Sequence, residues 1–169
     1  EVEELDSMMV PLENVYGIAD HLRCLAFMFG DGITPSNEGE GYLSRLVLRR
    51  TLRLMRELGL DEPLTELMSM ELDHLGSNFP ELQKTRDYIL EVVDLEEDKY
   101  RETLDQGQRM VSRLASSLKE KGESEISTEK LIELYDSNGL PPEVVREVAE
   151  EEGVEVNQPD DFYMQVAES

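Results

Sequence analysis

The residues of this chain that are best suited to bind a charged ligand are five arginines in one short stretch. They are Arg45, Arg49, Arg50, Arg53 and Arg56. From Ile33 to Arg56 only Glu38 and Glu40 oppose them, whereas the whole chain has 16 Lys+Arg against 39 Asp+Glu. A cluster of positive charge on so acidic a chain points to an anionic ligand, and a nucleic-acid backbone is the first candidate.

On a helix, most of these arginines share one ridge. At 100° per residue, Arg45, Arg49, Arg53 and Arg56 fall within about 80° of one another. The alternative is an ordinary solvated face, but only Glu57 interrupts the arginines, and a solvated face on this chain should be acidic or mixed. Guanidinium groups also make two-pronged contacts to phosphate. We therefore favour contact with a phosphate backbone.

Two further residues could contact a base edge. Asn37 ends the segment Pro35-Ser36-Asn37 just before the arginines, and its amide can both donate and accept hydrogen bonds. The spacing alone favours a plain turn, because these residue types form turns. Asp136 precedes a Gly-Leu-Pro turn, where it could brace the turn or accept a hydrogen bond from the amino group of guanine. The sequence leaves both interpretations of Asp136 open.

The remaining reactive residues do not form a catalytic pattern. Asp20, His21 and Arg23 could include an acid–base pair, but an internal hydrogen-bond network is the favoured interpretation. We expect Cys24, the single cysteine, to be buried like a small apolar residue. Only His21 and His74 accompany it, so no spacing suggests a metal site. There is no glycine-rich phosphate loop, no pair of catalytic carboxylates and no nucleophile elbow, and we assign no catalytic residue.

Apolar residues at helical spacing predict an all-α fold, a bundle with long helices followed by a small C-terminal helical subdomain. The expected helices cover residues 12–30, 41–58, 63–75, 80–120 (one long helix or two), 128–135 and 142–153, with a last short helix from residue 157. The polar stretch 119–127 contains Gly122, which predicts a boundary between a subdomain 1–122 and a smaller subdomain 123–169.

Composition limits the class of protein. With 169 residues, 39% hydrophobic and 33% charged, the chain is typical of a soluble globular protein. It has no apolar run long enough for a membrane span and no signal pattern, so we expect a cytoplasmic location. Because the chain begins at Glu1 within a helical pattern, we expect it to be a segment of a longer protein. The net charge of −23 suggests a halophilic source, since only high salt screens such self-repulsion.

Five motifs carry a resemblance to a known family. They are Tyr16–Arg23, Gly30–Glu38, Gly41–Arg50, Phe79–Leu82 and Leu134–Pro142. In this order they resemble the alanyl-tRNA synthetase family, and its archaeal branch in particular. The resemblance covers essentially the whole chain, although residues 59–124 are only generically helical.

The resemblance implies a place within a larger enzyme that attaches alanine to its tRNA with ATP. The chain is similar to the helical middle domain between the class II catalytic core and the editing domain. In the family, this domain binds the acceptor stem and senses a G·U wobble pair. The implied partners are the tRNA for alanine and the two neighbouring domains. ATP and Mg²⁺ would bind the catalytic domain and Zn²⁺ the editing domain, with no cofactor in this segment, which we expect to be monomeric.

Residue by residue, the resemblance assigns Asn37 and Asp136 to the wobble pair, approached from the minor groove. It assigns Arg45, Arg49 and Arg50 to the RNA backbone. Many relatives carry another arginine where this chain has Leu46, and the neighbouring Arg53 and Arg56 are the candidates to compensate for it.

Two functions of other classes remain alternatives. The first is an acidic helical protein–protein interaction module, in which the arginine ridge meets an acidic partner. The second is a self-contained enzyme built around Asp20 and His21, and it is the least favoured of the three.

Overall fold

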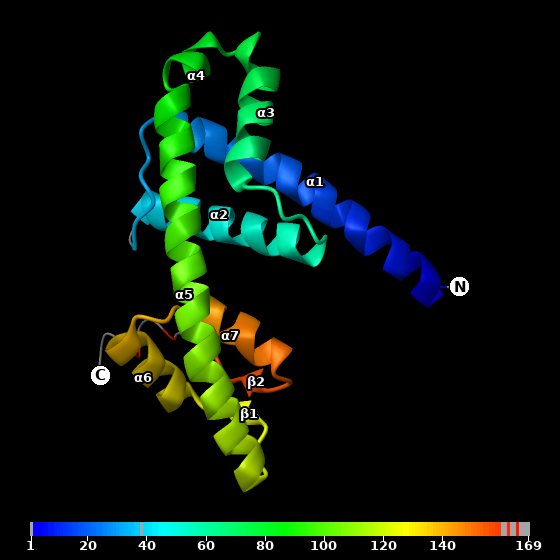
Figure 1. The fold of residues 1–169 in the computed structure, drawn as a ribbon, viewed down its shortest axis with the longest axis vertical. Coiled ribbons are helices and arrows are strands. Elements are labelled where there is room, and N and C mark those ends of the chain that lie inside the picture. The colour runs from blue at the N-terminus through cyan, green and yellow to red at the C-terminus, as the bar shows by residue number, and fades with distance from the viewer. Residues whose placement is uncertain (1, 38, 160–161, 163–164, 166–169) are drawn as a thin grey trace. The chain divides into compact units, whose positions relative to one another are not determined.

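A computed structural model describes residues 2–37, 39–159, 162 and 165, and these divide into two compact units. The first unit is Glu1–Tyr100 and the second is Arg101–Ser169. The described residues form seven helices and two short strands, which confirms the predicted all-α class (Figure 1). None of these helices is long and apolar enough to pass through a membrane.

The first unit is built from four helices and the first part of a fifth. These are α1 (Val2–Gly30), α2 (Gly39–Glu57), α3 (Leu64–Gly76), α4 (Pro80–Lys84) and α5 (Arg86–Lys121). α1 packs against α2, α3 and α4. Its inward residues, Ile18, Leu22, Leu25, Ala26 and Phe29, follow the spacing of one helical face, so they bury an apolar stripe against the other helices.

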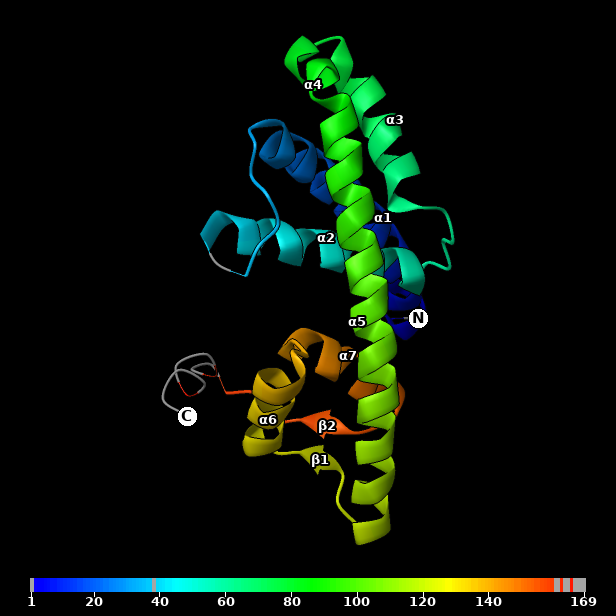
Figure 2. The ribbon, with the colours of Figure 1, turned by 60° about the vertical axis from the view of Figure 1, so that its left-hand side comes forward.

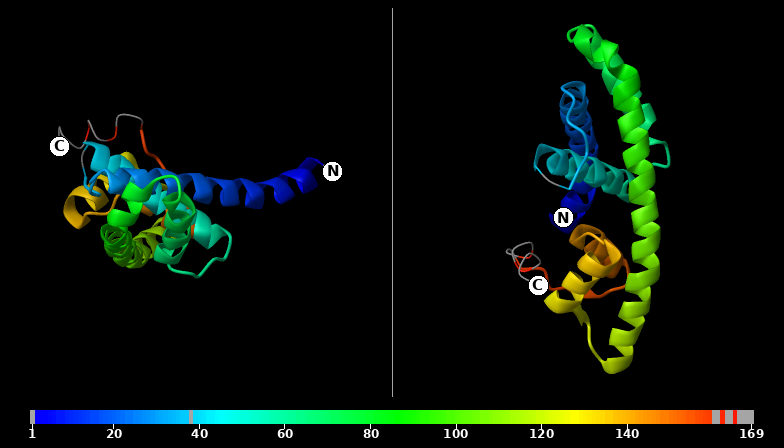
Figure 3. Two further views of the ribbon diagram at one scale, coloured as in Figure 1. Left: turned by 90° about the horizontal axis from the view of Figure 1, so that it is seen from above. Right: turned by 90° about the vertical axis from the view of Figure 1, so that its left-hand side faces the viewer.

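The predicted start of the first helix was too late. The helix begins at Val2 rather than Leu12 and continues through Pro11 (Figure 3). The helix accommodates this proline although it lacks an N–H to donate and crowds the preceding turn.

Residues 80–120 form two helices, α4 and the long α5, with Thr85 between them. Gly107 does not interrupt α5, because its missing side chain makes room for α7 of the second unit. A Cβ atom at Gly107 would lie 3.0 Å from Val144. The contacts divide the chain inside α5, between Tyr100 and Arg101, rather than at residues 122 and 123. The reason is that the later part of α5 contributes Val111 and Ala115 to the second core.

The second unit packs α6 (Thr128–Asn138) and α7 (Pro142–Glu151) on the later part of α5. Two strands, β1 (Glu125–Ile126) and β2 (Glu155–Val156), pair in parallel beside them (Figure 2). Strands of two residues are too short to show alternation, so no pattern in the sequence indicated them. The last helix, predicted from residue 157, falls largely outside the described residues, although Phe162 is buried in the second core.

α6 ends later than predicted, at Asn138 instead of Tyr135. Gly139 closes it with a left-handed φ of 66°, and its N–H donates to Tyr135 O at 2.9 Å. The next N–H, of Leu140, donates to Leu134 O at 3.2 Å. This glycine-closed end places Asp136 in the last turn of α6, where the predicted helix had already ended, and still ahead of the Gly-Leu-Pro turn.

A buried acidic residue of α5 caps α3. The helix starts after Pro63, which offers no side-chain acceptor, and the backbone N–H of Leu64 donates to Glu97 Oε2 at 3.0 Å. Glu97 is only 4% exposed. The cap is therefore supplied by a distant segment of the chain.

Glu97→Ala should lower the free energy of unfolding of the first unit by about 1–3 kcal/mol, because it leaves a buried N–H without its charged acceptor. Chemical denaturation followed by circular dichroism would measure this. The neighbouring exposed residue offers a control, and Asp98→Ala should change stability by less than about 0.5 kcal/mol. Equal losses for both variants would contradict the capping role.

Candidate nucleic-acid interface

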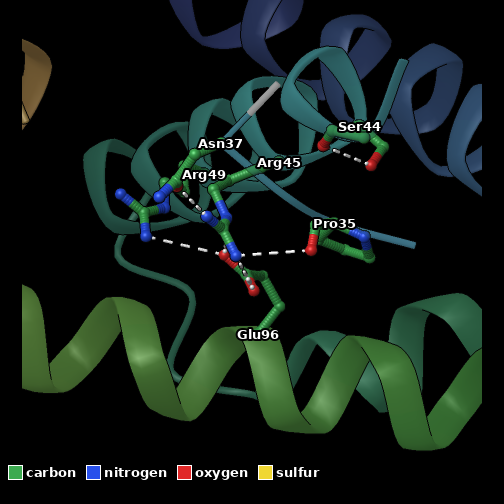
Figure 4. Close-up of polar contacts among 7 residues, drawn as sticks. Pro35, Asn37, Ser44, Arg45, Arg49 and Glu96 are labelled. Atoms are coloured by element: carbon green, nitrogen blue, oxygen red, sulfur yellow. Dashed lines mark hydrogen bonds and ion pairs between the residues drawn. The ribbon is translucent and has the colours of Figure 1, made fainter. Parts of the chain in front are cut away.

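A buried carboxylate of α5, that of Glu96, binds two of the predicted arginines (Figure 4). Arg45 Nε lies 2.7 Å from Oε1, and Arg45 Nη2 lies 3.3 Å from Oε2. Arg49 Nη2 lies 3.5 Å from Oε1. The Glu96 side chain is 2% exposed and each arginine side chain 16%. Two members of the arginine ridge therefore face α5 and share one negative charge.

Arg45 also binds the loop that precedes α2. Its Nη1 donates to Asn37 Oδ1, and its Nη2 donates to the carbonyl oxygen of Pro35 at 3.4 Å. One guanidinium thus joins the carboxylate of Glu96 to two residues of the loop. The structure brings together Asn37, Arg45 and Arg49 around an acidic residue that the sequence analysis did not single out.

The loop has further attachments on both sides. The hydroxyl groups of Thr34 and Tyr88 of α5 lie 3.2 Å apart. The backbone N–H of Ser36 donates to Gly41 O at 3.1 Å, and Ser44 Oγ donates to the same oxygen at 2.9 Å. A Cβ atom on Gly41 would come within 2.3 Å of Thr34 O. Gly41 therefore allows the loop to fold back onto the start of α2.

These contacts bear on which hydrogen-bonding groups Asn37 offers most readily to a ligand. Its side-chain oxygen accepts from Arg45, and the residue is exposed. An amide whose oxygen is engaged still has its NH₂ group, which donates. Asn37 is therefore suited to meet an acceptor on a ligand.

The other arginines of α2 have different surroundings. Arg49, besides its contact with Glu96, places its guanidinium carbon 5.5 Å from the centre of the Tyr100 ring. Arg53 Nε pairs with Glu57 Oε1 of the next turn at 3.1 Å. Arg50 and Arg56 are exposed. Of the five arginines of α2, Arg50, Arg56 and the half-buried Arg53 are therefore the most accessible to a large anion.

Asp136 belongs to the second unit and is exposed in the last turn of α6. The end of this helix is tied to α5 by Gln106 Nε2, which donates to Asn138 O at 3.1 Å. Asn37 lies in the first unit, so the two predicted base-contacting residues belong to different units.

The residues that raised the enzyme alternative take part in contacts between helices. His21 Nδ1 lies 3.2 Å from Thr51 Oγ1 of α2, and Arg23 Nε lies 3.2 Å from Glu71 Oε1 of α3.

The prediction that Cys24 is buried is wrong. It is exposed, because its neighbours Leu22 and Leu25 take the inward positions of α1. Among the described residues no group of acidic, histidine or cysteine side chains could hold a metal ion.

The sequence did contain a signal for Glu96. Ile89, Val93 and Tyr100 form the buried stripe of α5, and Glu96 falls at the same helical spacing as these three. An acidic residue on a buried stripe needs a positive partner, and the arginine-rich α2 supplies it.

Comparisons with known proteins agree on one family. Residues 5–169 match the family model described as "tRNA synthetases class II (A)". The chain is 50% identical over 99% of its length to the alanine–tRNA ligase of Methanothermobacter thermautotrophicus. It is 51% identical over 98% of its length to that of Pyrococcus furiosus, and 49% identical over 99% to that of Methanococcus maripaludis strain C7. It spans 19%, 18% and 19% of these relatives, about a fifth of their length.

Gly41→Ala should displace the loop, because the added methyl group would collide with the backbone at Thr34. We expect a loss of about 1–3 kcal/mol in stability and faster hydrogen exchange at the Ser36 amide. A matched control is Gly39→Ala, where the added methyl meets nothing within 4 Å but φ is 59°. That variant tests backbone strain alone, and unchanged Ser36 exchange in Gly41→Ala would contradict the close packing.

His21 makes the stability of the first unit depend on pH. Burial lowers the pKa of His21 from its ordinary value of 6.5, Arg50 lowers it further and Asp20 opposes them. The unfolded chain therefore binds a proton more readily, so the contribution is complete above pH 6.5 and is lost as the pH falls towards the folded-state pKa. His21→Gln should reduce the fall in melting temperature between about pH 7 and about pH 5.5. An unchanged fall would contradict this role.

Proposed function

Because the chain belongs to the class II (A) family of tRNA synthetases, we propose that it is the tRNA-recognition part of an alanine–tRNA ligase. In this proposal it binds the acceptor stem and reads a G·U wobble pair, and the parent enzyme then attaches alanine to that tRNA at the expense of ATP. The ATP, Mg²⁺ and Zn²⁺ of the parent belong to its catalytic and editing domains, and the expected setting is the cytoplasm.

The observation that carries the proposal is the bond of Asn37 to Arg45, which is itself paired with the buried Glu96. A residue that reads a base edge must be held in place before the RNA arrives, since ordering a loose loop on binding costs free energy. Here the loop is bonded at Thr34, Pro35, Ser36 and Asn37. This degree of attachment exceeds what a simple turn before a helix requires.

The two base-contacting residues have complementary chemistry. A G·U pair leaves the amino group of guanine without a base partner, and this group lies in the minor groove. The carboxylate of Asp136 accepts a hydrogen bond from it. Asn37 donates through its NH₂ group to a minor-groove acceptor such as the O2 atom of uracil or N3 of guanine. A donor and an acceptor together distinguish the wobble pair better than either alone.

The arginines of α2 provide affinity rather than sequence discrimination. Phosphate contacts fix the register and orientation of the stem. The exposed Arg50 and Arg56, with the half-buried Arg53, contact the phosphates in this proposal. Arg45 and Arg49 add positive charge beside them while they remain paired with Glu96.

The test is a titration of the chain, in about molar KCl, with two acceptor-stem hairpins that differ only in G·U against G·C. We expect tighter binding of the G·U hairpin. Asp136→Ala should reduce that preference by about 5- to 150-fold, the range for one base-edge contact. In the full-length enzyme the same variant should lower charging of wobble-pair tRNA much more than charging of the G·C variant.

The control is Asp105→Ala, which removes an equal charge from an exposed position of the same unit. It should leave the preference unchanged. Equal binding of both hairpins by the unmodified chain would contradict a role in reading the base pair. It would leave only electrostatic attraction between the arginines and the phosphates, an electrostatic grip. Absence of binding to either hairpin would favour the protein–protein module instead.

A further inference from the structure

We propose that Glu96 of α5 is a positioning residue for wobble-pair recognition, which acts on Asn37 through Arg45. This inference rests on the proposed function. It holds that a buried residue sets how well that site distinguishes a G·U pair from a G·C pair. Glu96 lies beneath α2 and is only 2% exposed, so it acts without touching RNA itself (Figure 4).

The burial of Glu96 is costly in itself. Removing a carboxylate from water is offset only by well-placed opposite charge and hydrogen bonds, and apolar residues often serve stability as well. The other residues of this stripe, Ile89, Val93 and Tyr100, are of the kind expected in a core. A carboxylate at this position is therefore explained by what it orients, which is the guanidinium group of Arg45.

The geometry of Arg45 explains how Glu96 can orient Asn37. Its Nε and Nη2 face the two oxygens of Glu96, and this two-pronged contact fixes the plane of the guanidinium. The remaining nitrogen, Nη1, is then directed at Asn37 Oδ1. Because that bond engages one of the two lone pairs of the oxygen, the NH₂ group is the more available part of the Asn37 amide for the RNA.

Without Glu96 the same arginine would have a different role. A long side chain released from its carboxylate regains rotamer freedom and is attracted to nearby phosphates. Arg45 would then leave Asn37 and join the electrostatic grip. The inference thus predicts that loss of the Glu96 carboxylate lowers the preference for G·U over G·C but does not lower the general affinity for RNA.

The decisive variant is Glu96→Gln, which keeps the shape of the side chain and removes its charge. In the hairpin titration its ratio of G·U to G·C affinity should fall at least about fivefold, while its affinity for the G·C hairpin stays equal to or above that of the unmodified chain. The control is Glu91→Gln, at an exposed position of the same helix, which changes the net charge equally. It should alter both affinities alike and keep the ratio.

A second measurement needs no RNA. The Ser36 amide, which donates to Gly41 O, reports the order of the loop. Its hydrogen exchange should be faster in Glu96→Gln than in Glu91→Gln. If the unmodified chain shows no G·U preference, the proposed function fails, whereas the exchange result still decides whether Glu96 orders the loop.

A third variant covers the case in which Glu96→Gln does not fold. Arg45→Lys keeps the positive charge beside Glu96, but a single ammonium group cannot reproduce the fork that reaches Asn37. It should lose the G·U preference and speed Ser36 exchange as well. The inference is overturned if a folded Glu96→Gln keeps the preference, or if Arg45→Lys keeps both the preference and slow Ser36 exchange.

Discussion

The ion pair between Glu96 and the arginines of α2 is the interaction on which the first unit's candidate site depends. A buried carboxylate requires positive partners, and positively charged residues are scarce on a chain of net charge −23. Arg45 and Arg49 meet this requirement and join α2 to α5. The loop that carries Asn37 is then ordered as a consequence, because Arg45 reaches it from the same position. Core packing and the proposed recognition of RNA therefore share one guanidinium group.

The helices could be predicted well because each buries a stripe of apolar residues at a regular spacing. The errors arose where a local signal competed with packing. The first helix was predicted to start at residue 12, whereas α1 continues back through Pro11 to Val2, and Cys24 was assigned to the core by residue type although the inward positions belong to Leu22 and Leu25. Asp136 was placed just beyond a helix predicted to end at Tyr135, whereas the helix continues to Asn138 and is closed by Gly139. The paired strands gave no signal since each has two residues.

The candidate site could be predicted only by residue type. The arginines and Asn37 stand close together in the sequence, so composition and the family resemblance identified them. Glu96 lies 51 residues from Arg45, and neither spacing nor charge count pairs residues across that separation. The sequence consequently suggested one open ridge of arginines, whereas the structure divides the same arginines between an internal ion pair and an exposed surface. The donor role proposed for the NH₂ group of Asn37 depends on its bond with Arg45, which the sequence alone does not show.

This division also determines how salt should act on the two properties of the site. At about 1 M salt the screening length is roughly 3 Å, so contacts between exposed arginines and phosphates weaken strongly. The pair between Glu96 and Arg45 is largely removed from solvent and is screened much less. The orientation of Asn37 should therefore persist at salt concentrations that remove most of the electrostatic grip. In the proposed function, an acidic domain built in this way discriminates by a few short-range hydrogen bonds when long-range attraction contributes little.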